Sequence, residues 1–190
     1  MRGFTMHTVR PNDTIYSIAR QYGSDVNRIL FSNPNLDIYN LLIGNKIKVP
    51  FGDIVPTDVR YPYELMNMNI LSLQNLYPFI EVMDIGNSVL GRPILSLKIG
   101  TGPKEVFYNA SFHANEWITS VVLMKFVEDY ARAIATNDTI SGYLANDIYQ
   151  TTTLYVVPMV NPDGVDLVTS YLTPSSTGYQ TALSISQRLS

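Results

Sequence analysis

The chain contains no cysteine and only two histidines among its 190 residues. The absence of cysteine excludes a disulfide framework, a cysteine nucleophile and every zinc site built from thiolates. The two histidines are His7 and His113, which lie far apart in the sequence. A site that needs two imidazoles would therefore have to bring these two residues together.

Charge and long apolar runs are also scarce. Only 15% of the residues are charged and the net charge is −3, which argues against a nonspecific nucleic-acid binder. No segment approaches the roughly 18 apolar residues of a membrane-spanning helix, so we expect no membrane span. The hydrophobic fraction of 46% is enough for a buried core and argues against a disordered chain.

Residues 6–50 have the pattern of a small module. A short strand at Thr8 and Val9 precedes a turn in which Asp13 or Thr14 can cap a helix. Apolar residues at helical spacing then predict helices over residues 15–22 and 26–30, and alternation predicts a closing strand over residues 46–50. The predicted order is strand, helix, helix, strand.

This pattern resembles the lysin motif (LysM). The matching residues are His7-Thr8-Val9, Asn12-Asp13-Thr14-Ile15, Ile18-Ala19, Tyr22, Asn33-Pro34 and the run from Leu41 to Pro50. The resemblance implies binding of polymers that contain N-acetylglucosamine, chiefly peptidoglycan. By position it assigns glycan contacts to Asn12, Asp13, Thr14, Ile15, Asn40, Leu41, Leu42 and Ile43. In the alternative interpretation Asp13 and Thr14 are only a helix cap and Ile15 is only a core residue.

Residues 51–62 contain two prolines and one glycine without periodicity and are predicted to be a linker. In the following unit, residues 63–190, we expect a helix over 65–77 and a hairpin of strands 80–85 and 94–99. A strand over 105–111 is apolar on both faces, which predicts a central position, and a helix over 117–135 is expected to be well buried. With a further strand over 152–157, these elements predict an α/β sandwich.

His113 and Glu116 lie where the strand over 105–111 meets the following helix. Imidazole nitrogen and carboxylate oxygen are both zinc ligands, and positions i and i+3 can face the same way. Taken alone, the pair is better explained as a capping glutamate beside a hydrogen-bonded histidine.

Three blocks in order resemble the zinc carboxypeptidase family of metallopeptidases. They are residues 88–94 (SVLGRPI), 112–117 (FHANEW) and 157–164 (VPMVNPDG). The resemblance assigns His113 and Glu116 as zinc ligands, and Arg92, Asn161 and Asp163 as structural support near the site. It implies that the second unit is the N-terminal part of a carboxypeptidase-like mixed sheet with flanking helices.

A LysM joined to such a peptidase resembles bacterial γ-D-glutamyl–diamino-acid endopeptidases, which implies a muropeptide substrate. The family also uses a third zinc ligand, a histidine further along the chain, and a glutamate as general base, but no histidine follows His113. We therefore expect an N-terminal portion of such an enzyme, with weak or no zinc binding and no activity alone. The alternative is a noncatalytic wall-binding protein with a degenerate peptidase-like domain.

The compartment stays open at this point. The first seven residues lack the apolar segment of a signal peptide. Cytoplasmic accumulation with release during sporulation or lysis, and association with the cell wall, are both compatible with these residues.

Overall fold

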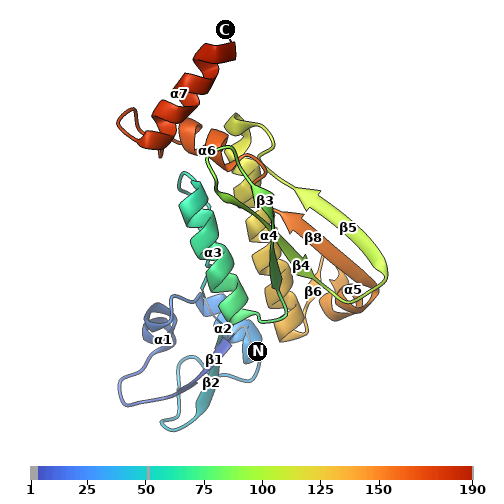
Figure 1. Ribbon diagram of the computed structural model, residues 1–190. Helices are drawn as coiled ribbons and strands as arrows, with labels where there is room; N and C mark the ends of the chain where they lie inside the picture. Colours follow the sequence, from blue (N-terminus) through green and yellow to red (C-terminus); the bar gives the residue numbers. More distant parts are fainter. Residues whose placement is uncertain (1–3, 51, 190) are drawn as a thin grey trace. The chain divides into compact units, whose positions relative to one another are not determined.

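The computed structural model describes residues 4–50 and 52–189. The chain divides into two compact units, with the boundary between Ile54 and Val55. Figure 1 shows the elements of each unit. Each unit has its own sheet and its own core.

The first unit has the predicted order of elements. They are β1 (Phe4–Thr8), α1 (Ile15–Gln21), α2 (Val26–Ser32) and β2 (Lys46–Pro50). The two strands pair antiparallel, from Phe4 opposite Pro50 to Thr8 opposite Lys46. Thr14 caps α1: its side chain accepts a hydrogen bond from the Ser17 amide, and the Ser17 hydroxyl accepts one from the Thr14 amide.

A small apolar core holds the first unit together. Its buried members are Val9, Ile15, Ile18, Ala19, Ile29, Ile47 and Val49. They come from β2, from both helices and from Val9, which directly follows β1, so these parts of the chain join in one cluster. A module of some 45 residues buries little surface, so it needs such a shared cluster to be stable.

The second unit contains a four-stranded mixed sheet. Its elements are α3 (Tyr63–Leu76), β3 (Glu81–Asn87), β4 (Pro93–Ile99), β5 (Lys104–Asn109), the 3₁₀ turn η1 (Ala114–Glu116), α4 (Trp117–Thr136), β6 (Thr139–Ile140), β7 (Tyr143–Leu144), α5 (Ala145–Thr151), β8 (Thr152–Val157), α6 (Pro162–Val168) and α7 (Thr177–Leu189). The strand order is β3-β4-β8-β5. The β3–β4 and β4–β8 pairs are antiparallel and the β5–β8 pair is parallel. The predicted α/β class and the predicted hairpin are confirmed.

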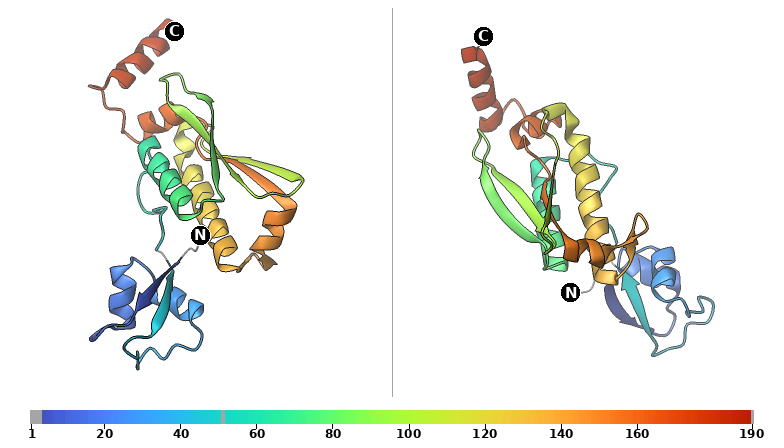
Figure 2. Two further views of the ribbon diagram at one scale, coloured as in Figure 1. Left: turned by 60° about the horizontal axis from the view of Figure 1, so that its bottom comes forward. Right: turned by 90° about the vertical axis from the view of Figure 1, so that its right-hand side faces the viewer.

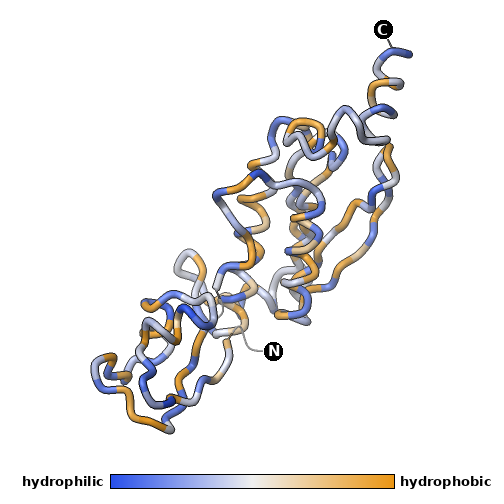
Figure 3. The backbone as a smooth tube through the Cα atoms, turned by 90° about the vertical axis from the view of Figure 1, so that its left-hand side faces the viewer, coloured by the Kyte–Doolittle hydropathy of each residue, from blue (hydrophilic) through white to orange (hydrophobic). Residues whose placement is uncertain are grey.

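Helices α3 and α4 lie on one face of this sheet (Figure 2). The register places Leu97 opposite Val156 and Ile99 opposite Leu154, so these four side chains share a face. All four are buried, with Leu97, Ile99 and Val156 fully so. Apolar and polar residues alternate along the helices of this unit, as expected for helices that are buried on one side (Figure 3).

Two burial predictions are wrong for the part of the chain that the structure describes. β5 is an edge strand, and Phe107 and Tyr108 are 58% and 50% exposed. The start of α4 is also open, because Ile118 and Val122 are exposed. An apolar sequence indicates that a strand tends to be buried, but it does not determine the order of strands in the sheet. Here β8 takes the central position and β5 lies at the edge.

Other differences concern helix ends and short elements. Asn161 caps α6, and Pro162 occupies its first position, where the missing amide hydrogen of proline is not needed for a helical hydrogen bond. α5, α7 and the β6–β7 hairpin were not predicted from the sequence. None of the described helices is long and apolar enough to cross a membrane.

Candidate functional site

The structure brings His113 and Glu116 together at the end of β5. The chain leaves the strand, passes through residues 110–113 and forms η1 before α4 begins. The Nδ1 atom of His113 lies 3.0 Å from Oε1 of Glu116. The side chains are 69% and 48% exposed, so a solute can reach both atoms.

This pair fits two positions of a zinc site. Zinc binds imidazole nitrogen and carboxylate oxygen at about 2.0–2.2 Å, and a tetrahedral angle then separates two ligand atoms by about 3.4 Å. The observed 3.0 Å is close to that separation, so a small side-chain adjustment suffices. Among the described residues, no cluster of three His, Asp or Glu side chains is arranged to hold a metal. Within the described part of the chain, His113 and Glu116 are therefore a candidate pair without a third member beside them.

The loop that carries the pair packs against the start of α6. The amides of Val160 and Asn161 donate to the carbonyls of Ala110 and Ser111, both at 3.0 Å. A side chain at Gly164 would place its Cβ 2.8 Å from the Cβ of Ala114, which is shorter than real contacts. The glycine thus allows α6 to approach η1 closely, which explains why this residue follows the Asn-Pro-Asp segment.

The three predicted support residues lie around α6. The Asn161 side chain accepts from the Gly164 amide and caps the helix. Asp163 accepts from the Ser88 hydroxyl at 3.0 Å and from the Leu90 amide at 2.9 Å, which holds the turn of the β3–β4 hairpin against α6. Among the described residues, none of these three side chains forms a hydrogen bond or ion pair with His113 or Glu116, and α6 is connected to the loop through backbone hydrogen bonds.

Sequence reasoning missed Asp166 as the partner of Arg92. Arg92 Nη1 lies 2.7 Å from Oδ2 of Asp166 and 3.7 Å from Oδ1 of Asp163. Asp166 is completely buried, and its other oxygen accepts from the Tyr63 amide at 2.8 Å. Burial raises the pKa of Asp166, while the Tyr63 amide and the Arg92 charge oppose that rise. The signal available in the sequence was a second aspartate three positions after Asp163, which lies on the same face of the helix.

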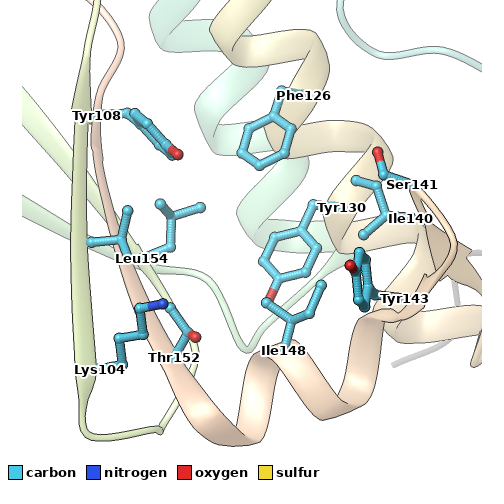
Figure 4. A pocket seen from close by; sticks show the side chains of 11 residues that line it. Lys104, Tyr108, Phe126, Tyr130, Ile140, Ser141, Tyr143, Ile148, Thr152 and Leu154 are labelled. Atoms are coloured by element: carbon cyan, nitrogen blue, oxygen red, sulfur yellow. The ribbon is translucent and has the colours of Figure 1, made fainter.

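Two hollows lie along β5 and α4, but His113 and Glu116 line neither of them. One has a volume of about 380 Å³ and is lined mainly by aliphatic and aromatic side chains, with Tyr108, Phe126, Tyr130 and Tyr143 among them (Figure 4). The other, of about 480 Å³, is lined by residues that include Tyr108, Ala110, Thr119 and Val122. Both are apolar, so neither provides ligands for a metal ion.

In the first unit, the segment over residues 12–15 is split between surface and core. Asn12 is exposed and has a φ of 71°, a left-handed conformation that asparagine tolerates better than most residues. Thr14 is exposed although its hydroxyl caps α1. Ile15 is 1% exposed and belongs to the core, which leaves only its backbone for a ligand.

Asp13 is held by a buried histidine. His7 is 2% exposed; its Nε2 lies 2.7 Å from Oδ2 of Asp13, and its Nδ1 lies 3.0 Å from the hydroxyl of Tyr22. The same Asp13 oxygen accepts from the Arg10 amide at 2.7 Å. The hydrogen bond from His7 lowers the pKa of Asp13, with a further contribution from Arg10. These contacts give Asp13 a structural role within the turn.

The segment over residues 40–43 presents apolar side chains to solvent. Leu42 and Ile43 are 58% and 68% exposed, and Asn40 is also exposed, whereas Leu41 packs against the core. Hydrogen bonds from Gly44 to Val9 and from Val9 to Asn45 fix this segment beside the end of β1. Sequence reasoning missed two exposed aromatic residues next to the predicted segments, Tyr16 and Tyr39.

Sequence comparisons give the same assignment to both units. The LysM domain profile matches residues 7–50, and the zinc carboxypeptidase profile matches residues 66–184. The chain is 50% identical over 109 residues to γ-D-glutamyl-L-diamino acid endopeptidase 1 of Lysinibacillus sphaericus, covering 57% of this chain and 28% of that protein. It is 28% identical over 107 residues to a zinc carboxypeptidase of Saccharothrix mutabilis subsp. capreolus, covering 53% and 23%. The chain thus spans less than a third of the length of these relatives.

A solved structure shows the same fold. Bovine thrombin-activatable fibrinolysis inhibitor, in complex with tick carboxypeptidase inhibitor, aligns with a TM-score of 0.51 and 21% identity, covering 62% of this chain and 36% of that one. The zinc carboxypeptidase profile extends over more than half of the chain, and it includes the strand, loop and helix that carry His113 and Glu116. The chain therefore belongs to the zinc carboxypeptidase family and carries a LysM domain at its N-terminal side.

Proposed function

We propose that this chain is part of a peptidoglycan-binding zinc metallopeptidase that hydrolyses the γ-D-glutamyl–diamino acid bond of cell-wall stem peptides. The observation that carries the proposal is the His113–Glu116 pair, 3.0 Å apart at the end of a parallel strand. The 50% identity to an endopeptidase of that specificity supports the choice of bond.

In this proposal His113 and Glu116 supply two of the zinc ligands through Nδ1 and a carboxylate oxygen. Zinc in such a site supplies Lewis-acid polarisation of the scissile carbonyl. No histidine follows His113 in this sequence, so we expect residues 1–190 to have no peptidase activity of their own. Arg92, Asn161 and Asp163 support the loop that carries the ligands.

The first unit would hold the enzyme at its polymer. LysM domains bind polymers of N-acetylglucosamine, and binding to the wall raises the effective concentration of the catalytic unit at its substrate. Exposed side chains of Asn12, Thr14, Asn40, Leu42 and Ile43 are the candidate contacts. Tyr16 and Tyr39 add exposed aromatic surface beside them. In this proposal the enzyme acts at the cell wall, and the compartment in which it accumulates is a separate question.

The metal site can be tested directly because the sequence has only two histidines. In a proton NMR titration with zinc, the ring signals of His113 should shift while those of buried His7 stay in place. Glu116→Gln keeps the shape of the side chain and should weaken zinc binding at least tenfold, since even lost outer-sphere support costs about 10–100-fold. If Glu116 were only a helix cap, the same change would leave zinc binding intact.

The activity is tested in the full reading frame that contains these residues. Continuation beyond Ser190 with an arginine and asparagine block, a histidine and a glutamate supports the enzyme. In that protein, His113→Ala and Glu116→Ala should abolish cleavage of a γ-D-glutamyl–diaminopimelate peptide and lower the zinc content, while binding to purified peptidoglycan is retained. Normal turnover with full zinc in the Glu116→Ala protein would refute the assignment.

A further inference from the structure

Ser111 occupies an unusual position just before the candidate metal ligands. It lies two residues before His113, it is 1% exposed, and its φ is 48°. This left-handed conformation is uncommon for residues other than glycine, asparagine and aspartate because the Cβ is crowded there. Glycine would adopt this backbone conformation with less strain than serine. The presence of serine therefore indicates a role for its hydroxyl group.

Every polar atom of Ser111 has a partner. Its amide donates to Oγ1 of Thr119 at 2.9 Å, and its carbonyl accepts from the Asn161 amide at 3.0 Å. Its Oγ lies 2.6 Å from Oγ of Ser120 and 3.2 Å from the carbonyl oxygen of Glu116. The residue therefore joins the end of β5 to the start of α4 and to the cap of α6.

The protons of this network can be counted. Ser120 donates its hydroxyl proton to the carbonyl of Pro158, and Thr119 donates its own to the Glu116 carbonyl at 2.7 Å. The Ser111 hydroxyl proton is then available for the Ser120 oxygen or the Glu116 carbonyl. Ser111 and Ser120 are both buried, so water does not replace these bonds easily.

We propose that Ser111 is a positioning residue for the metal-binding pair: its hydroxyl, together with Thr119 and Ser120, fixes the backbone of Glu116 so that the carboxylate faces the same point as the His113 imidazole. The side chains of the pair are largely exposed, so their orientation depends on the backbone between residues 111 and 116. The inference rests on the proposed zinc site, and it adds the residue that arranges that site before metal binds.

The test compares Ser111→Ala with Ser111→Gly in the 190-residue chain. Both variants remove the hydroxyl, but only glycine also relieves the left-handed backbone. Ser96→Ala is the matched control, because Ser96 is a buried serine of the same unit on β4. Thr119→Val removes a second hydroxyl of the network, and Thr119→Ser retains it.

The first measurement needs no metal. The Glu116 amide donates to the His113 carbonyl and the Asn161 amide to Ser111, so hydrogen exchange at these two amides monitors the loop. Loss of one net hydrogen bond corresponds to roughly a 2- to 12-fold change in an opening equilibrium. We expect exchange to accelerate by that factor in Ser111→Ala, Ser111→Gly and Thr119→Val, with unchanged rates at the β4–β8 amides and in the Ser96→Ala and Thr119→Ser proteins.

The second measurement is the zinc titration of the His113 ring signals, with His7 as internal reference. The same three variants should bind zinc more weakly by a similar factor. Unchanged exchange and zinc affinity in Ser111→Gly would overturn the inference, because the backbone conformation alone would then suffice. Equal acceleration at all amides of the unit would also overturn it, since that result indicates general destabilisation.

The two proposals fail in different ways. If His113→Ala leaves the zinc content of the protein from the full reading frame unchanged, the proposed zinc site is wrong. The exchange rates at Glu116 and Asn161 still decide whether the Ser111 hydroxyl holds the loop.

Discussion

Replacing Arg92 by alanine should destabilise the second unit by about 3–5 kcal/mol at neutral pH, because it leaves the buried Asp166 carboxylate without its counter-charge. The Arg92–Asp166 distance is 2.7 Å, and Asp166 is completely buried. At an effective dielectric constant of about 20, two unit charges 4 Å apart interact by about 4 kcal/mol, which agrees with that range. Since domains are stable by only about 5–15 kcal/mol, the effect is large.

The loss should depend on pH in a defined direction. Burial already raises the pKa of Asp166 above its ordinary 3.8, and removal of the Arg92 charge should raise this pKa further. The folded state then binds a proton that the unfolded state releases, so stability rises as the pH falls towards 4. The deficit of Arg92→Ala should therefore be largest at pH 7 and smaller at pH 4–5. The double variant Arg92→Ala/Asp166→Asn carries no buried charge and should lose less stability than Arg92→Ala alone.

Chemical denaturation followed by tryptophan fluorescence measures this effect in the right unit, because Trp117 is the only tryptophan. Arg60→Ala is the control: Arg60 is an exposed arginine of the same unit whose side chain donates to the Thr169 carbonyl at 3.2 Å. Its removal should cost less than about 1 kcal/mol. Equal losses for the two arginines, or a greater loss in the double variant than in Arg92→Ala, would refute the reasoning.

Three further predictions concern single residues. The pKa of Asp13 is lowered mainly by its hydrogen bond to His7, so the stability that this contact contributes should be present above pH 4 and lost as the pH falls below it. In Asp13→Asn, the stability of the first unit, followed by the ring signals of His7, should depend less on pH in this acid range. Gly164→Ala should destabilise the second unit by about 1–3 kcal/mol in tryptophan-detected unfolding, because the new Cβ meets η1 at 2.8 Å; a neutral result would show that α6 moves away freely. Ile15→Ala should cost about 2–5 kcal/mol in stability of the first unit, whereas Tyr39→Ala should leave stability unchanged and weaken binding to N-acetylglucosamine oligomers; chemical-shift changes by NMR distinguish the two outcomes.

Local patterns in the sequence were sufficient for the first unit and for most elements of the second. Alternation predicted β2 and β4, turn residues between two strand-like runs predicted the β3–β4 hairpin, and β-branched and aromatic residues predicted β8. Apolar residues at helical spacing predicted α1 to α4. These signals are local because a strand or helix face repeats every two or every three to four residues. The i, i+3 spacing of His113 and Glu116 likewise predicted that the two side chains lie within one turn, and in the structure Nδ1 and Oε1 are 3.0 Å apart.

The tertiary structure decided what depends on neighbours distant in sequence. An apolar composition could not show that β8 lies between β4 and β5, because strand order is set by crossover connections and not by the strand itself. The pairing of Arg92 with Asp166 spans more than 70 residues, and the turn at Ser111 joins β5, α4 and α6. Ion pairs and buried hydroxyl networks of this kind produce no periodic pattern in the sequence. Each polar atom needs only one suitable partner nearby in space, and that partner can come from any part of the chain.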